Sequence, residues 1–163
     1  MLTIRPATRA DIPLIQEITA RTWPQTYTPI LGEEQVAYML RTMYSTAALQ
    51  HQMDSGHHFL IGYSAGMPVG FASYSLHEPR TYKLHKLYIL PENRGTGAGR
   101  ALMAHIINEI KLLGASALVL NVNRYNHSAF SFYQRGGFTV IGEEDIDIGG
   151  GYFMNDYVLQ YTF

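Results

Sequence analysis

The sequence predicts one α/β domain whose sheet mixes parallel and antiparallel strands. Two apolar runs at 59–63 and 69–75 are joined by Ser64-Ala-Gly-Met-Pro68, which is typical of a β-hairpin. A strand at 82–90 is followed by a glycine-rich turn, a helix closed by Gly114, and an apolar run at 117–122. Strand, helix and buried strand in this order predict a parallel pair with a right-handed crossover. A chain of 163 residues, 47% hydrophobic and 15% charged, is long and apolar enough to bury one core.

The other elements follow from apolar periodicity. We expect a strand at 2–5, a helix that ends at Pro24, an irregular proline-rich segment at 22–31, and helices at 33–44 and 46–53. A short helix capped by Asn126 and strands at 138–141 and 152–161 complete the sheet, with an acidic, glycine-rich loop at 143–151 between these strands. Strict alternation in the strand at 82–90 places Lys83, His85, Leu87 and Ile89 on one face.

The turn Arg94-Gly-Thr-Gly-Ala-Gly-Arg100 has the chemistry of a phosphate site. Its glycines allow a close approach to the backbone, and the helix that follows points free N–H groups and the positive end of its dipole at the turn. A connection without a ligand is disfavoured, because three glycines weaken the flanking elements. The spacing G-x-G-x-G fits neither the dinucleotide fingerprint nor the nucleotide-triphosphate loop.

Charge and composition exclude several classes of function. A formal charge of −1 argues against binding nucleic acid by neutralising its phosphates. No apolar run approaches the roughly 20 residues needed to span a bilayer. The first residues show no basic region followed by an apolar stretch, so we expect no signal peptide and, by default, a cytoplasmic location. Cysteine is absent, and the seven histidines show no ligand spacing, so we expect no metal.

A second stretch, Asn126-His-Ser-Ala-Phe-Ser-Phe-Tyr133-Gln-Arg-Gly-Gly-Phe138, identifies a family when it is read with the glycine turn. The pair resembles the GCN5-related N-acetyltransferase (GNAT) pattern, [QR]-x-x-G-x-[GA] followed by N-x-x-A-x-x-[FY]-Y-x-x-x-G-F. Trp23 with Tyr27, the strand Leu84-His-Lys-Leu-Tyr88 and the ending Gly150-Gly-Tyr-Phe-Met-Asn-Asp156 look most like the PaiA-type polyamine acetyltransferases. The resemblance implies a mostly antiparallel sheet of about seven strands with one parallel pair and helices on both faces.

The resemblance implies acetyl-CoA as the acetyl donor and a primary amine as the acceptor, with direct transfer in a ternary complex. Backbone groups of Leu87, Tyr88 and Ile89 are expected to pair with the pantetheine arm, and Asn126 and Ser128 to lie along it. The pyrophosphate is expected on the backbone of the glycine turn, which comprises Arg94, Gly95, Thr96, Gly97, Ala98, Gly99 and Arg100.

In the family pattern, Tyr133 is the general acid that protonates the departing thiolate. His85 is the candidate base, with His77 and Glu78 acting through water as alternatives; a sheet histidine without catalytic role is equally compatible with the pattern. Trp23, Tyr27 and Glu78 are candidate acceptor contacts, although core packing explains the aromatic residues as well. The acidic run at 143–147 attracts a polyamine if it faces the acceptor cleft, and is otherwise a solvated loop.

The expected function is therefore acetylation of a small amine, with polyamines first. The alternatives are acetylation of a protein amino group and a CoA-binding regulatory module without turnover. The aromatic C-terminal strand could pair with a second subunit to form a homodimer.

Overall fold

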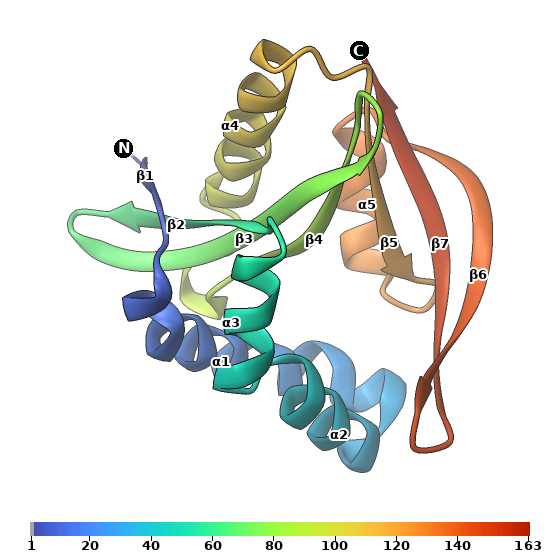
Figure 1. Cartoon of the computed structure of the whole chain (residues 1–163). Helices are drawn as coiled ribbons and strands as arrows, with labels where there is room; N and C mark the ends of the chain where they lie inside the picture. The colour runs from blue at the N-terminus through green and yellow to red at the C-terminus, as the bar shows by residue number, and fades with distance from the viewer. Residues whose placement is uncertain (1) are drawn as a thin grey trace.

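A seven-stranded sheet with helices on both faces forms the computed structural model, which describes residues 2–163 (Figure 1). Its strands lie in the order β1-β2-β3-β4-β5-β7-β6. They are β1 (Leu2–Pro6), β2 (His58–Ser64), β3 (Met67–Glu78), β4 (Thr81–Ile89), β5 (Ala117–Asn123), β6 (Thr139–Gly149) and β7 (Tyr152–Thr162). The predicted mixed sheet with one parallel pair is confirmed.

The helices divide between the two faces, and each face has its own core. On one face, α1 (Ile12–Leu31), α2 (Glu33–Met43) and α3 (Thr46–Asp54) bury apolar side chains such as Ile15 and Leu49 against the sheet. On the other, α4 (Ala98–Leu112) and α5 (His127–Arg135) cover a core that contains Leu102, Leu118 and Leu159. Short 3₁₀ turns at Arg9–Asp11 and Pro91–Asn93 precede α1 and α4.

The parallel pair of β4 and β5 is short. Thr81–Leu84 pairs with Ala117–Leu120, but β4 continues to Ile89 with β3 as its partner, and β5 continues to Asn123 with β7 as its partner. The two central strands therefore separate beyond Leu84 and Leu120. Their facing edges carry backbone N–H and C=O groups that no strand in the described chain satisfies.

A β-bulge at His85 corrects the expected alternation of β4. Ser73 lies opposite Lys86 and Tyr74 lies opposite Leu84, so His85 is the extra residue. Leu84 consequently faces the same core as Leu87 and Ile89, while Lys86 points to the opposite face, over the ring of Tyr44. The prediction that His85 shares a face with Leu87 was wrong, because one inserted residue reverses the pattern after it.

Helix α1 does not end at Pro24, and the segment at 22–31 is helical. Pro24 and Pro29 lie inside α1, where each removes one backbone hydrogen bond. Trp23 is only 4% exposed and packs on Tyr27, with 4.5 Å between ring centroids, and on Tyr44, at 5.3 Å. This burial offsets the lost hydrogen bonds, so tertiary packing overrides the local propensity.

The acidic segment at 143–151 is also regular. Residues Thr139–Gly149 form β6, and only Gly149–Gly151 turn back into β7. Ile146 and Ile148 alternate with acidic residues, and this period of two is typical of a strand. Since β7 lies between β5 and β6, the C-terminal strand is not an edge and cannot extend the sheet into a second subunit, so the homodimer stays a prediction without this contact.

Candidate functional site

A cleft of ≈ 1020 Å³ opens where β4 and β5 separate. It is lined by the end of α1, by 84–89 of β4, by the glycine turn, by 120–122 of β5 and by one side of α5 along its length, from 127 to 135. All of the predicted cofactor contacts line it: Leu87, Tyr88, Ile89, Arg94, Gly95, Thr96, Gly97, Ala98, Gly99, Arg100, Asn126 and Ser128. The structure thus brings the two motifs to one cavity.

The glycine turn has the geometry of an anion site. Gly95 and Gly97 have φ of 76° and 88°, values that favour glycine, and Gly97 caps the N-terminus of α4. The first amide of α4 to bond within the helix is that of Ala101, to the Gly97 carbonyl at 3.0 Å. The backbone amides that precede Ala101 have no partner within the helix, and they lie at the positive end of the helix dipole, which faces this end of the cleft. Arg94 and Arg100 are exposed and form no ion pair with the described residues, so their charge is available to a phosphate.

Close packing fixes the strand and helix that carry these groups. A Cβ on Gly99 would lie 3.4 Å from the ring of Phe132, an ordinary contact, so α4 and α5 already pack closely at this point. A Cβ on Gly70 of β3 would lie 2.5 Å from the carbonyl oxygen of Tyr88. Sequence reasoning missed Gly70; a glycine inside a strand signals a close backbone approach, and that signal was available.

Tyr133 and Asn126 stand on α5 at the cleft wall. The Asn126 side chain caps α5 by accepting a hydrogen bond from the Ala129 amide at 3.3 Å. Tyr133 packs edge-on against Phe132 and Phe138, with 5.3 and 5.6 Å between ring centroids. Burial, reinforced by Tyr27, raises the pKa of the Tyr133 hydroxyl above its usual range. Tyr133 therefore carries its proton at neutral pH.

His85 lines the cleft in a polar contact with its neighbours. Its Nε2 lies 2.7 Å from Ser75 Oγ, and its ring stacks on His57 with centroids 4.1 Å apart. Burial, followed by the nearby positive groups His57 and Lys86, lowers the pKa of His85 to about 3. The ring is therefore neutral throughout the physiological range.

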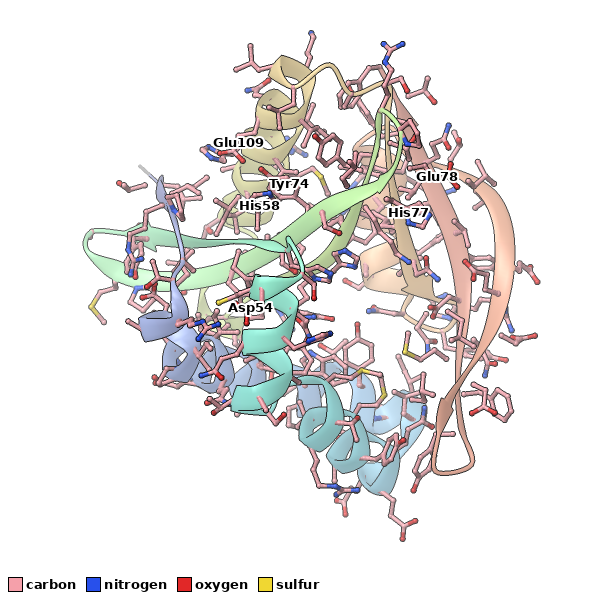
Figure 2. All side chains as sticks on the ribbon, viewed as in Figure 1. Asp54, His58, Tyr74, His77, Glu78 and Glu109 are labelled. Atoms are coloured by element: carbon pink, nitrogen blue, oxygen red, sulfur yellow. The ribbon has the colours of Figure 1, made fainter. Side chains whose placement is uncertain are left out.

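The candidate acceptor contacts separate in the structure. Tyr27 lines the cleft, but Trp23 is buried in the core behind it and is not part of the lining. Glu78 and His77 are exposed at the end of β3, by the turn into β4, and do not line the cleft (Figure 2). Glu78 lies opposite Thr81, and Thr81 is six residues before Leu87 on β4. Glu78 is therefore far from the cleft.

Sequence reasoning also missed Asp156, a carboxylate that is only 4% exposed on β7. Its Oδ2 accepts a hydrogen bond from Asn121, a cleft residue, at 3.2 Å. Glu144 of β6 lies opposite Asp156. Its neighbours Glu143 and Asp145 form ion pairs with Arg124 instead. Glu144 and Asp156 thus share a face, and burial raises the pKa of Asp156.

A polar cluster of Tyr74, His105 and Glu109 lies outside the cleft, between β3 and α4. Tyr74 donates a hydrogen bond to Glu109 at 2.5 Å, and His105 lies 3.0 Å from the same carboxylate (Figure 2). Residues 2–163 contain no group of three or more His, Cys, Asp or Glu placed to hold a metal ion. Within the same range, no helix is both long and apolar enough to cross a bilayer.

Comparison with known proteins identifies the family. Residues 27–151 match the model of the acetyltransferase (GNAT) domain. An uncharacterised N-acetyltransferase of Mycobacterium bovis is 31% identical over 150 residues, which cover 91% of this chain and 96% of that protein. A spermidine N(1)-acetyltransferase of Thermoplasma acidophilum is 27% identical over 151 residues, which cover 90% and 91%.

The fold comparison agrees with the family match. The crystal structure of the PaiA N-acetyltransferase from Thermoplasma acidophilum in complex with coenzyme A superposes with a TM-score of 0.85 at 26% identity, covering 100% of this chain and 99% of that one. The chain matches the family along most of its length. It also has the separated strands β4 and β5, the glycine turn at the start of α4 and the tyrosine on α5. The protein belongs to the GNAT family and is an acetyl-CoA-dependent N-acetyltransferase.

Proposed function

We propose that this enzyme transfers the acetyl group of acetyl-CoA to a primary amine of a small molecule, with polyamines as the first acceptors to test. The observation that carries the proposal is the separation of β4 from β5 beyond Leu84, beside the hydroxyl of Tyr133. Free amides on the β4 edge can pair with the pantetheine arm and polarise the thioester carbonyl, as preorganised donors do for a developing oxyanion. The cleft volume of ≈ 1020 Å³ is large enough for an extended cofactor arm together with a small acceptor.

In the proposed reaction, the neutral amine nitrogen attacks the thioester carbon and the carbon–sulfur bond breaks. Tyr133 donates its proton to the departing sulfur and regains one from solvent, while the nitrogen, positively charged after the attack, releases one proton to solvent as the amide forms. Its raised pKa keeps it protonated before the reaction, and its packing between Phe132 and Phe138 fixes the direction of the hydroxyl.

The protonated amine must first lose a proton, and His85 is the proposed proton acceptor. An alkylammonium has a pKa of about 10, whereas that of His85 is about 3, so direct transfer is uphill by about 10 kcal/mol. His85 can therefore act only as a relay that passes the proton to solvent. His85→Ala should shift the basic limb of the pH–rate profile if this relay operates; an unchanged limb would assign deprotonation to water.

Two observations support a cationic acceptor. Asp156 and Glu144 form an acidic wall beside Asn121, which lines the cleft. The Thermoplasma acidophilum relative carries the name of a spermidine acetyltransferase. Of these two carboxylates only Asp156 is buried, and a buried carboxylate stabilises an ammonium group more strongly than an exposed one because the local dielectric is lower.

A CoA-release assay across polyamines, amino acids, aminoglycosides and peptides tests the proposal. We expect release with small amines and little with peptides. Release with peptides alone would identify a protein acetyltransferase. Tight binding of acetyl-CoA without release for any acceptor would identify a regulatory module. A cytoplasmic location stays a prediction.

A further inference from the structure

The face of β4 that is turned toward Tyr44 and Phe59 carries a lysine with no partner of opposite charge among residues 2–163. Lys86 follows the bulge at His85, precedes Leu87 and lines the cleft. Its Nζ lies 4.9 Å from the ring centroid of Tyr44 and 5.9 Å from that of Phe59. Among residues 2–163, none of the ion pairs and hydrogen bonds formed by side chains includes the Lys86 ammonium. Aromatic faces alone hold this charge.

The polar groups around Lys86 are positive or neutral. His57 and His85 stack next to it, and Ser73 lies directly opposite it on β3. His57 Nδ1 and Ser73 Oγ are buried and have no hydrogen-bond partner within the described chain. No carboxylate lies within 4.0 Å of Lys86, whereas the acidic wall of Asp156 and Glu144 belongs to β7 and β6. Burial lowers the pKa of Lys86 to about 8, as expected for an ammonium without a counter-ion.

A partly buried ammonium beside a substrate cleft is stabilised when the substrate brings an anion. The Lys86 ammonium lines the cleft and can donate up to three hydrogen bonds. The same charge repels a second ammonium group in a low dielectric. This wall therefore favours an acceptor with a carboxylate and disfavours one that carries only positive charge.

We propose that Lys86 forms a carboxylate-binding subsite on the cleft wall, so that the preferred acceptor is a short amino acid rather than a polyamine. The inference rests on the proposed acetyl transfer and narrows its substrate class. Such an acceptor places its carboxylate on β4 and its reactive amine at the gap between β4 and β5, while any further ammonium group can face Asp156.

The test compares acceptors that differ only in the carboxylate. Ornithine is putrescine with an added carboxylate, and lysine is related to cadaverine in the same way. For the wild-type enzyme we expect kcat/KM to be higher for the amino acid of each pair, by roughly 10- to 100-fold, the range for one charge-assisted contact. This comparison needs no mutation, so it is independent of any effect on folding.

Lys86→Met keeps the length and apolar character of the side chain and removes the charge. We expect this variant to lose most of the preference through a higher KM for ornithine and lysine, together with a lower KM for putrescine and cadaverine because the repulsion of their ammonium groups is removed. Lys111→Met, on an exposed lysine of α4, is the matched control and should retain the preference. Thermal unfolding of both variants checks that they are folded.

The outcomes separate this inference from the proposed function. Preference of the wild-type enzyme for the diamines, or an unchanged preference in Lys86→Met, would overturn the carboxylate subsite and leave acetyl transfer to amines intact. Absence of CoA release with all four acceptors, and with the rest of the amine panel, would overturn the proposed transfer itself.

Discussion

Gly70→Ala tests whether the packing of β3 against β4 sets the position of the cofactor strand. The new Cβ would lie 2.5 Å from the Tyr88 carbonyl oxygen and 2.6 Å from Ile89 Cδ1. An ordinary contact needs about 3.4 Å, so β4 must move by about 1 Å at the residues expected to pair with the pantetheine arm. Such overpacking costs about 1–3 kcal/mol of the free energy of unfolding, or about 2–12 °C in Tm for a chain of this size.

The displacement should affect catalysis more than stability, because a shift of about 1 Å in a positioned group can cost about 100-fold in rate. We expect a higher KM for acetyl-CoA and a fall in kcat/KM of roughly 10- to 100-fold, measured by CoA release. Gly62→Ala is the matched control: Gly62 pairs with Gly70 across β2 and β3, and its Cβ would meet Leu2 at an ordinary 3.5 Å. Equal Tm and KM for the two variants would refute the reasoning.

Three further predictions concern the acid, the histidine and the turn. Tyr133→Phe should lower kcat about 100-fold with an unchanged KM for acetyl-CoA, and Tyr125→Phe, an exposed cleft residue, should not; equal kcat values would exclude Tyr133 as the acid. His85 binds a proton near pH 6.5 when unfolded but near pH 3 when folded, so the free energy of unfolding falls as the pH drops from 6.5 to 4. Urea unfolding of His85→Asn should show a shallower fall than His51→Asn, an exposed control, and a fall of equal slope would contradict the burial of His85. Gly97→Ala forces a side chain onto φ of 88° and should cost about 1–2 kcal/mol and weaken acetyl-CoA binding, measured by calorimetry, whereas Ser131→Ala, at a half-buried residue outside the cleft lining, should leave binding unchanged.

The order of elements could be predicted because each hydrophobic period is clear and each boundary carries a turn residue. The crossover from β4 through α4 to β5 is an example, with glycine at both ends of the helix. The end of α1 could not be predicted, because Pro24 and Pro29 disfavour a helix there and the burial of Trp23 offsets their effect. Burial of this kind depends on contacts between distant segments, which local propensity does not contain.

The cofactor half of the site follows from local sequence, because a turn with positive φ requires glycine and an anion site requires the amides that follow it. The acceptor half depends on register. One bulged residue at His85 turns Lys86 toward Tyr44 and the cleft, and the pairing of β6 with β7 brings Glu144 to Asp156. Neither effect leaves a mark in the spacing of the sequence, so Lys86 and Asp156 emerge from the structure alone.

The central claim is that this chain moves acetyl groups from acetyl-CoA to small amines through the gap between β4 and β5. It is tested most directly by incubating the purified protein with acetyl-CoA and the amine panel, then measuring free CoA thiol and acetylated amine together. The account predicts that the two products appear in equal amounts and that both fall about 100-fold in Tyr133→Phe. Binding of acetyl-CoA with no acetylated amine from any acceptor would contradict it.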